Sequence, residues 1–88
     1  MPEPIRIDIY SRPGCHLCDE AAKVIQHYRG EIPVVLNTIN VESSNDLEAR
    51  YGVDIPVVMV NGNEAFRHRV NGPELERKLK ALWNRSTS

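Results

Sequence analysis

The chain contains two cysteines, Cys15 and Cys18, within the segment YSRPGCHLCDEAAKVI (residues 10–25). A C-x-x-C pair can bind a metal, form a structural disulfide or carry out thiol–disulfide exchange. A structural zinc site usually has four protein ligands, so histidines would have to complete the set. His16 lies between the two cysteines, where so short a loop can hardly bring it to the same ion. We therefore expect no metal site.

A purely structural disulfide is the second interpretation of the pair. In the loop-entropy model, a disulfide that closes about four residues stabilises a fold by roughly 2 kcal/mol, against about 4.7 kcal/mol for a 100-residue loop. A reducing compartment would also tend to keep the two cysteines as free thiols. A structural role is therefore a weak explanation.

Thiol–disulfide exchange fits the surroundings of the pair better. Cys15 lies at the predicted start of a helix, and Arg12 precedes it by three residues. A helix N-terminus and a nearby cation both favour the reactive thiolate, although two acidic residues in the first turn oppose them. Cys18 should lie one turn further into the helix and be less exposed. We predict that Cys15 attacks a substrate disulfide and that Cys18 resolves the mixed disulfide.

Composition restricts the class of protein. The chain has 88 residues, 41% of them hydrophobic, which suits one domain over residues 1–88. A net charge of −1 argues against general binding to nucleic acid or to an anionic membrane. There is no long apolar run, and the start MPEPIRIDIY does not have the pattern of a secretory signal. We expect a cytoplasmic monomer.

Hydrophobic periodicity predicts seven elements in the order β-α-β-α-β-β-α, an α/β fold. The expected strands cover residues 5–10, 33–41, 57–60 and 63–70, with a hairpin turn at Asn61-Gly62. The expected helices run from about Leu17 to Tyr28, from a capping pair Ser43/Asp46 to Gly52, and from Pro73 into a polar, frayed tail at about Asn84. The first two strands should be parallel, in a mixed four-stranded sheet whose helices on both faces bury residues 57–60 completely.

Two motifs, YSRPGCHLC (residues 10–18) and IPVVMVNG (residues 55–62), carry a family resemblance. Together with the order of elements, they make the chain from Ile5 to about Trp83 resemble the glutaredoxin-like branch of the thioredoxin superfamily. It is most similar to a group of small C-x-x-C glutaredoxin-like proteins. The resemblance implies a thioredoxin fold and a cis Pro56 facing the thiols. It also implies that Ile55 offers backbone groups to a peptide or to glutathione, and that Arg12 helps to bind glutathione.

The chain departs from that family at two places. Glutaredoxins commonly carry C-P-Y-C, and here the middle residues are His16 and Leu17. The segment RVNGPELERKL (residues 69–79) lacks the Gly-Gly and Asp that help to hold glutathione in the family. We therefore expect weak glutathione binding.

The leading hypothesis is a thiol–disulfide oxidoreductase with no bound cofactor. Its substrate would be a protein disulfide, a glutathione mixed disulfide or a low-molecular-weight thiol, and glutathione or a thioredoxin-reductase-type donor would regenerate the dithiol. One alternative is an iron–sulfur carrier that holds a [2Fe–2S] cluster between two subunits with glutathione. Another is a redox-inactive binding module of thioredoxin fold.

Three further residues are candidate modulators of the thiols. His16 is more simply an electrostatic neighbour than an acid–base catalyst. Tyr10 ends the strand that leads to the dithiol and is more simply a packing residue. Asp8 allows two interpretations. It could share an exposed face with Arg6. Alternatively, helices could cover this side of the sheet, and Asp8 would then resemble the buried acid of thioredoxins, lie beneath the dithiol and act as general base toward Cys18.

Overall fold

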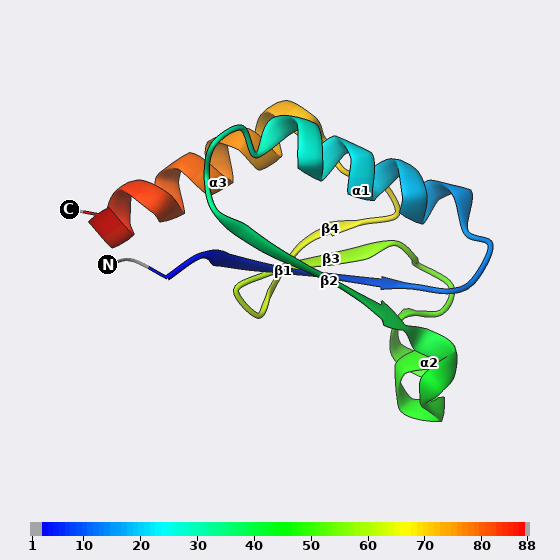
Figure 1. Ribbon diagram of the computed structural model, residues 1–88. Coiled ribbons are helices and arrows are strands. Elements are labelled where there is room, and N and C mark those ends of the chain that lie inside the picture. The colour runs from blue at the N-terminus through cyan, green and yellow to red at the C-terminus, as the bar shows by residue number, and fades with distance from the viewer. Residues whose placement is uncertain (1–2, 88) are drawn as a thin grey trace.

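A computed structural model describes residues 3–87, and the side chains of residues 3–85. Its elements follow the predicted order (Figure 1). The strands are β1 (Ile5–Ser11), β2 (Val34–Asn40), β3 (Val57–Val60) and β4 (Asn63–Arg67). The helices are α1 (His16–Tyr28), α2 (Asn45–Tyr51) and α3 (Gly72–Thr87), and a single 3₁₀ turn, η1 (Val41–Ser43), precedes α2.

The four strands form one mixed sheet in the order β2-β1-β3-β4, as expected. β1 runs parallel to β2, with Ile5 opposite Val34, and antiparallel to β3, with Tyr10 opposite Val57. The end of β1 and the start of β3 therefore meet at the same edge of the sheet. The cysteine segment follows β1 and the Ile55–Pro56 segment precedes β3, so the topology brings both motifs together.

One face of the sheet packs against α1 and α3, which lie on the same side in Figure 1. Alternate residues of β1 point to this face, and Ile7 and Ile9 are almost fully buried there. They share a core with Ile25 of α1 and with Leu75 and Leu79 of α3. Burial of such side chains is worth roughly 1.5–3 kcal/mol each, so this face holds the first strand and its following helix together.

The opposite face is covered only at one end, by α2 (Figure 1). There the ring of Tyr10 stacks on that of Tyr51, with centroids 4.3 Å apart. Beyond this contact the face is open, and Val35 is 46% exposed. Helices do lie on both faces, but the expectation that they bury the whole of β3 was wrong for Met59, which is half-buried. A helix of seven residues is too short to cover four strands.

Several element boundaries differ from the predicted ones. The cap of α2 is Ser44, whose hydroxyl accepts from the backbone N–H groups of Asp46 and Leu47, rather than Ser43. β2 ends at Asn40 because its side chain accepts from the N–H of Glu42 and starts the 3₁₀ turn.

The last two elements also differ. β4 ends at Arg67, since His68 has φ of 71° and leaves the extended conformation. α3 continues to Thr87, past the expected start of the polar tail at about Asn84, and Ser88 lies outside the described residues. The predicted Asn61-Gly62 turn is confirmed, with φ of 49° and 85°.

Candidate active site

Cys15 is the N-cap of α1, with φ of −82° and ψ of 107°. The Pro13-Gly14 turn separates β1 from α1, and Gly14 adopts φ of 78°, which a glycine accommodates without steric conflict. The Sγ atom of Cys15 accepts a hydrogen bond from the backbone N–H of Cys18 at 3.3 Å. A sulfur at this position faces the unpaired N–H groups of the first helical turn, which favour an anion. The predicted placement at the helix start is thus confirmed.

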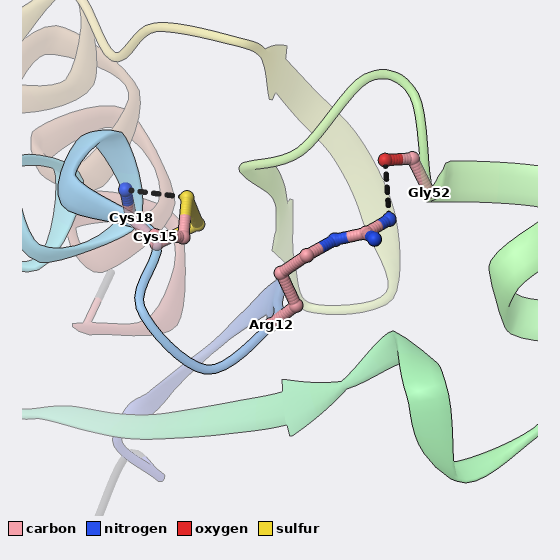
Figure 2. The surroundings of a disulfide bond; sticks show 4 residues. All are labelled: Arg12, Cys15, Cys18 and Gly52. Carbon is pink, nitrogen blue, oxygen red and sulfur yellow. Dashed lines mark hydrogen bonds between the residues drawn. A yellow bond between two sulfur atoms is a disulfide. The ribbon is translucent and has the colours of Figure 1, made fainter.

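The two cysteines form a disulfide (Figure 2), with their Cα atoms 5.3 Å apart. That separation lies within the usual range for disulfides. Cys18 is 6% exposed, whereas Cys15 is only partly buried. The expected asymmetry in exposure is therefore present, and solvent or a substrate reaches Cys15 more easily.

A hollow of about 320 Å³ opens beside Cys15. The end of β1, the turn before α1 and the end of β2 form its walls, with lining residues Ser11, Arg12, Pro13, Gly14, Cys15, Asp19, Thr38 and Asn40. Thr38 and Asn40 were not anticipated as site residues. They reach the hollow because Asn40 pairs with Ser11 in the parallel register, and no local pattern in β2 signals that contact.

A second hollow, of about 240 Å³, adjoins Leu17, the residue before Cys18. It lies between α1 and the segment that follows β4, and its lining residues are Leu17, Glu20, Ala21, Val24, His68, Arg69 and Val70. The dithiol segment thus borders two hollows, each lined by both polar and apolar groups.

Arg12 binds α2 and the residue after it. Its Nη2 donates to Oε1 of Glu48 at 2.7 Å and to the carbonyl oxygen of Gly52 at 2.8 Å. Figure 2 shows the side chain extending toward Gly52. The side chains of Arg12 and Glu48 are 33% and 43% exposed, so the ion pair remains in contact with solvent. The cation expected to serve the thiols or glutathione is therefore engaged by a carboxylate of the same chain.

Gly52 is required at its position by a close approach. A Cβ atom there would lie 2.5 Å from both the carbonyl oxygen and Oε1 of Glu48. Real Cβ atoms do not approach oxygen so closely, so any larger residue would displace Glu48. The glycine thereby lets Glu48 and the Gly52 carbonyl converge on Arg12.

The Ile55–Pro56 peptide bond is cis, as the resemblance implied, and Pro56 is fully buried. The backbone N–H of His68 donates to the carbonyl oxygens of Pro56 at 2.7 Å and of Asp54 at 3.1 Å. Within residues 3–87, the backbone N–H and C=O of Ile55 form no hydrogen bond. Ile55 therefore presents unpaired backbone groups at the sheet edge that also carries the dithiol.

A second arginine holds the same loop from β4. Nη1 of Arg67 lies 2.6 Å from Oδ2 of Asp54, and its Nε lies 2.8 Å from Oε2 of Glu64. The hydrogen bond from Arg67 lowers the pKa of the Glu64 carboxyl below its ordinary value. The loop before β3 is thus attached to Arg12 on one flank and to Arg67 on the other.

Asp8 lies on the open face of the sheet, opposite to the face that packs against α1. Its side chain is 15% exposed, pairs with Nε of Arg6 at 3.2 Å and accepts from Nδ2 of Asn37 at 3.1 Å. The neighbouring residue, Ile9, points to the α1 face. The interpretation of Asp8 as a buried acid beneath Cys18 was therefore wrong, because β1 presents alternate residues to opposite faces.

The other candidate modulators are placed as follows. His16 is the first residue of α1 and is exposed, outside the lining of both hollows. Tyr10 packs α2 onto the sheet through its stacked ring.

Within the described part of the chain there is no group of three His, Cys, Asp or Glu residues suited to a metal ion. None of the helices over residues 3–87 has the length and apolar character needed to cross a membrane.

Comparison with known proteins gives consistent matches. The family model described as "Glutaredoxin-like domain (DUF836)" matches residues 6–80. A thioredoxin of Methanocaldococcus jannaschii is 26% identical over 84 residues, which cover 92% of this chain and 95% of the relative. A protein of Dictyostelium discoideum named as glutaredoxin-like is 26% identical over 84 residues, covering 89% of this chain and 78% of the relative.

A solved structure of a thioredoxin variant from Halobacterium salinarum superposes on this chain with a TM-score of 0.58. The identity is 15%, and the match covers 90% of this chain and 74% of that chain. At that identity the likeness concerns the fold alone. The mixed sheet with α1 and α3 on one face is the thioredoxin fold, with the C-x-x-C pair at the start of α1.

Proposed function

Because the chain belongs to the glutaredoxin-like domain family (DUF836), we propose that it is a thiol–disulfide oxidoreductase acting through Cys15 and Cys18. The observation that carries the proposal is the geometry of the pair. The partly exposed Cys15 caps α1, and the buried Cys18 donates its N–H to the Cys15 sulfur. An attacking thiol needs access and a stabilised thiolate, whereas a resolving thiol needs only to reach its partner.

The reaction has two exchange steps. The Cys15 thiolate attacks one sulfur of the substrate disulfide, forms a mixed disulfide and releases the other sulfur as a thiolate that takes up a proton. Cys18 then loses its proton and attacks the Cys15 sulfur, which releases the second substrate thiol. The substrate gains two electrons, and the protein is left with the Cys15–Cys18 disulfide seen in the structure.

A substrate segment can pair with the loop before β3. The unpaired N–H and C=O of Ile55 are suited to an extended peptide that pairs with this loop in the manner of an added strand. The buried Pro56 fixes the start of β3 beside the end of β1. We assign substrate binding to Ile55, Pro56 and the hollow beside Cys15, with Arg12 on its wall.

Regeneration of the dithiol needs two electrons from another thiol. Glutathione is our proposed co-substrate, and it would be used without being tightly bound. The pairing of Arg12 with Glu48 supports the expectation of weak glutathione binding, because a guanidinium already paired with one carboxylate binds a second less well. A thioredoxin-reductase-type donor is the other source of electrons to be tested.

The proposal is tested with the reduced protein and the variants Cys15→Ser and Cys18→Ser, each incubated with insulin as the disulfide substrate. Cys15→Ser should be inactive. Cys18→Ser should accumulate a covalent mixed disulfide through Cys15, visible by mass spectrometry. In the parent protein, iodoacetamide should modify Cys15 before Cys18. Faster modification of Cys18, or insulin reduction by Cys15→Ser, would reverse the roles assigned to the two cysteines.

A further inference from the structure

The charges around the hollow beside Cys15 do not balance. Arg12 is the cation among its lining residues, and Asp19, in the first turn of α1, is the anion. The remaining lining side chains are uncharged apart from the Cys15 thiolate formed on reduction. Glu48 is bound to Arg12 at 2.7 Å and cancels its charge. The set formed by Arg12, Glu48 and Asp19 therefore has a net charge of −1.

The pair of Arg12 and Glu48 is well placed to exclude another carboxylate. The same Nη2 atom of Arg12 donates to Glu48 and to the carbonyl oxygen of Gly52. Gly52 leaves room for Glu48, whose carboxylate neutralises the cation of the hollow lining. An anionic substrate that approached Arg12 would meet a guanidinium whose charge Glu48 already neutralises, and it would be repelled by Asp19. Neutral and cationic substrates meet neither obstacle.

We propose that Glu48 is a specificity-determining residue, which occupies Arg12 and thereby directs the site toward neutral and cationic disulfides and away from carboxylate-bearing ones. The inference rests on the proposed oxidoreductase function, and it names the substrate class of the same site. Charge complementarity mainly affects the rate of productive encounter. The charge of Glu48 should therefore alter the rate at which Cys15 attacks each charged disulfide.

Three small disulfides of matched skeleton provide the test. Cystamine, bis(2-hydroxyethyl) disulfide and 3,3′-dithiodipropionate carry ammonium, hydroxyl and carboxylate groups, respectively, two carbons from sulfur. The second-order rate of thiol loss from the reduced protein is measured by acid quench and mass spectrometry at low salt. The rate constant for each charged substrate is divided by the rate constant for the neutral one. This ratio removes any change in the reactivity of the Cys15 thiol.

In Glu48→Gln, the carboxylate-to-neutral ratio should rise about fivefold over the parent, equivalent to about 1 kcal/mol, and the ammonium-to-neutral ratio should fall. Glutamine retains an oxygen that can accept from Arg12, so the loop should keep its position. Asp19→Asn, on an exposed side chain, should shift both ratios in the same directions. High salt should reduce all of these shifts.

Glu76→Gln is the matched control. Glu76 pairs with Lys80 on α3, and its side chain is 42% exposed, against 43% for Glu48. It should leave both ratios as in the parent. Unchanged ratios in Glu48→Gln, or equal shifts in Glu76→Gln, would overturn the inference. Reaction of the protein with the neutral disulfide would still support the proposed function. Failure to react with any of the three disulfides would instead overturn the proposed function, and the inference with it.

Discussion

Replacing Cys15 by serine or by alanine separates its structural role from its chemical one. Both variants lack the nucleophile and the disulfide, so both should be inactive. They differ in whether residue 15 can still accept the hydrogen bond from the N–H of Cys18, which the sulfur accepts at 3.3 Å. Serine is among the preferred N-cap residues, and alanine is among the poorest. Cys15→Ser should therefore be the more stable variant.

The size of the difference follows from the cap geometry. Residue 15 has the extended conformation of an N-cap, and its partner is the N–H of the third helical residue, Cys18. Replacing a good N-cap by alanine destabilises a helix by about 1 kcal/mol. In a chain of 88 residues, a change of about 1 kcal/mol shifts the melting temperature by about 4–8 °C. Cys15→Ser should melt higher than Cys15→Ala by about that amount.

The assay is thermal unfolding followed by circular dichroism, with a reductant present so that Cys18 does not form intermolecular disulfides. Ser44→Ala provides a benchmark, because Ser44 caps α2 by accepting from two N–H groups and lies outside the dithiol segment. The free energy of unfolding of Ser44→Ala should also be about 1 kcal/mol below that of the parent. Equal melting temperatures for Cys15→Ser and Cys15→Ala, with a clear loss in Ser44→Ala, would refute the capping role of residue 15.

Three further predictions concern the surrounding structure. Asp8→Asn should lower the free energy of unfolding by less than about 1 kcal/mol in urea titrations and leave the resolving rate unchanged, because a partly exposed ion pair contributes little; a gain in stability would contradict this. Gly52→Ala should destabilise the fold by about 1–3 kcal/mol, since its Cβ would overlap Glu48, and calorimetry should show a lower melting temperature. Arg67 lowers the pKa of Glu64, so this carboxyl stabilises the fold above its ordinary pKa and the contribution is lost as pH falls through the lowered value. Glu64→Gln should therefore weaken the acid dependence of stability, and identical pH profiles for the variant and the parent would exclude this effect.

The order of elements and the placement of the dithiol were predictable because they depend on local signals. Alternating isoleucines mark β1, the Pro13-Gly14 turn marks its end, and helical periodicity marks α1. Together these put Cys15 at a helix start. The Asn61-Gly62 turn likewise determines the hairpin of β3 and β4. Such signals act within a few residues, so one sequence is enough to read them.

The contacts that define the surroundings of the dithiol were not predictable in the same way. Arg12 and Glu48 are 36 residues apart, and no local pattern links them. Thr38 reaches the hollow through the register of the parallel pair of β1 and β2. The sequences of the two strands do not specify that register. For Asp8, the error came from assuming that helices cover both faces completely. The short α2 covers only the end of one face, and the alternation along β1 then places Asp8 in the uncovered part.

The attachment of the Gly52–Pro56 loop at both flanks has a consequence for the entropy of substrate binding. A loop that became ordered only on binding would lose roughly 1–2 kcal/mol of conformational freedom per residue. Here Arg12 holds the Gly52 carbonyl and Arg67 holds Asp54 before any substrate arrives. A segment that paired with Ile55 as we propose would lose only its own conformational freedom, and a short contact would suffice. For the proposed oxidoreductase, such preorganisation would suit brief encounters with many different extended segments, each released after reduction of its disulfide.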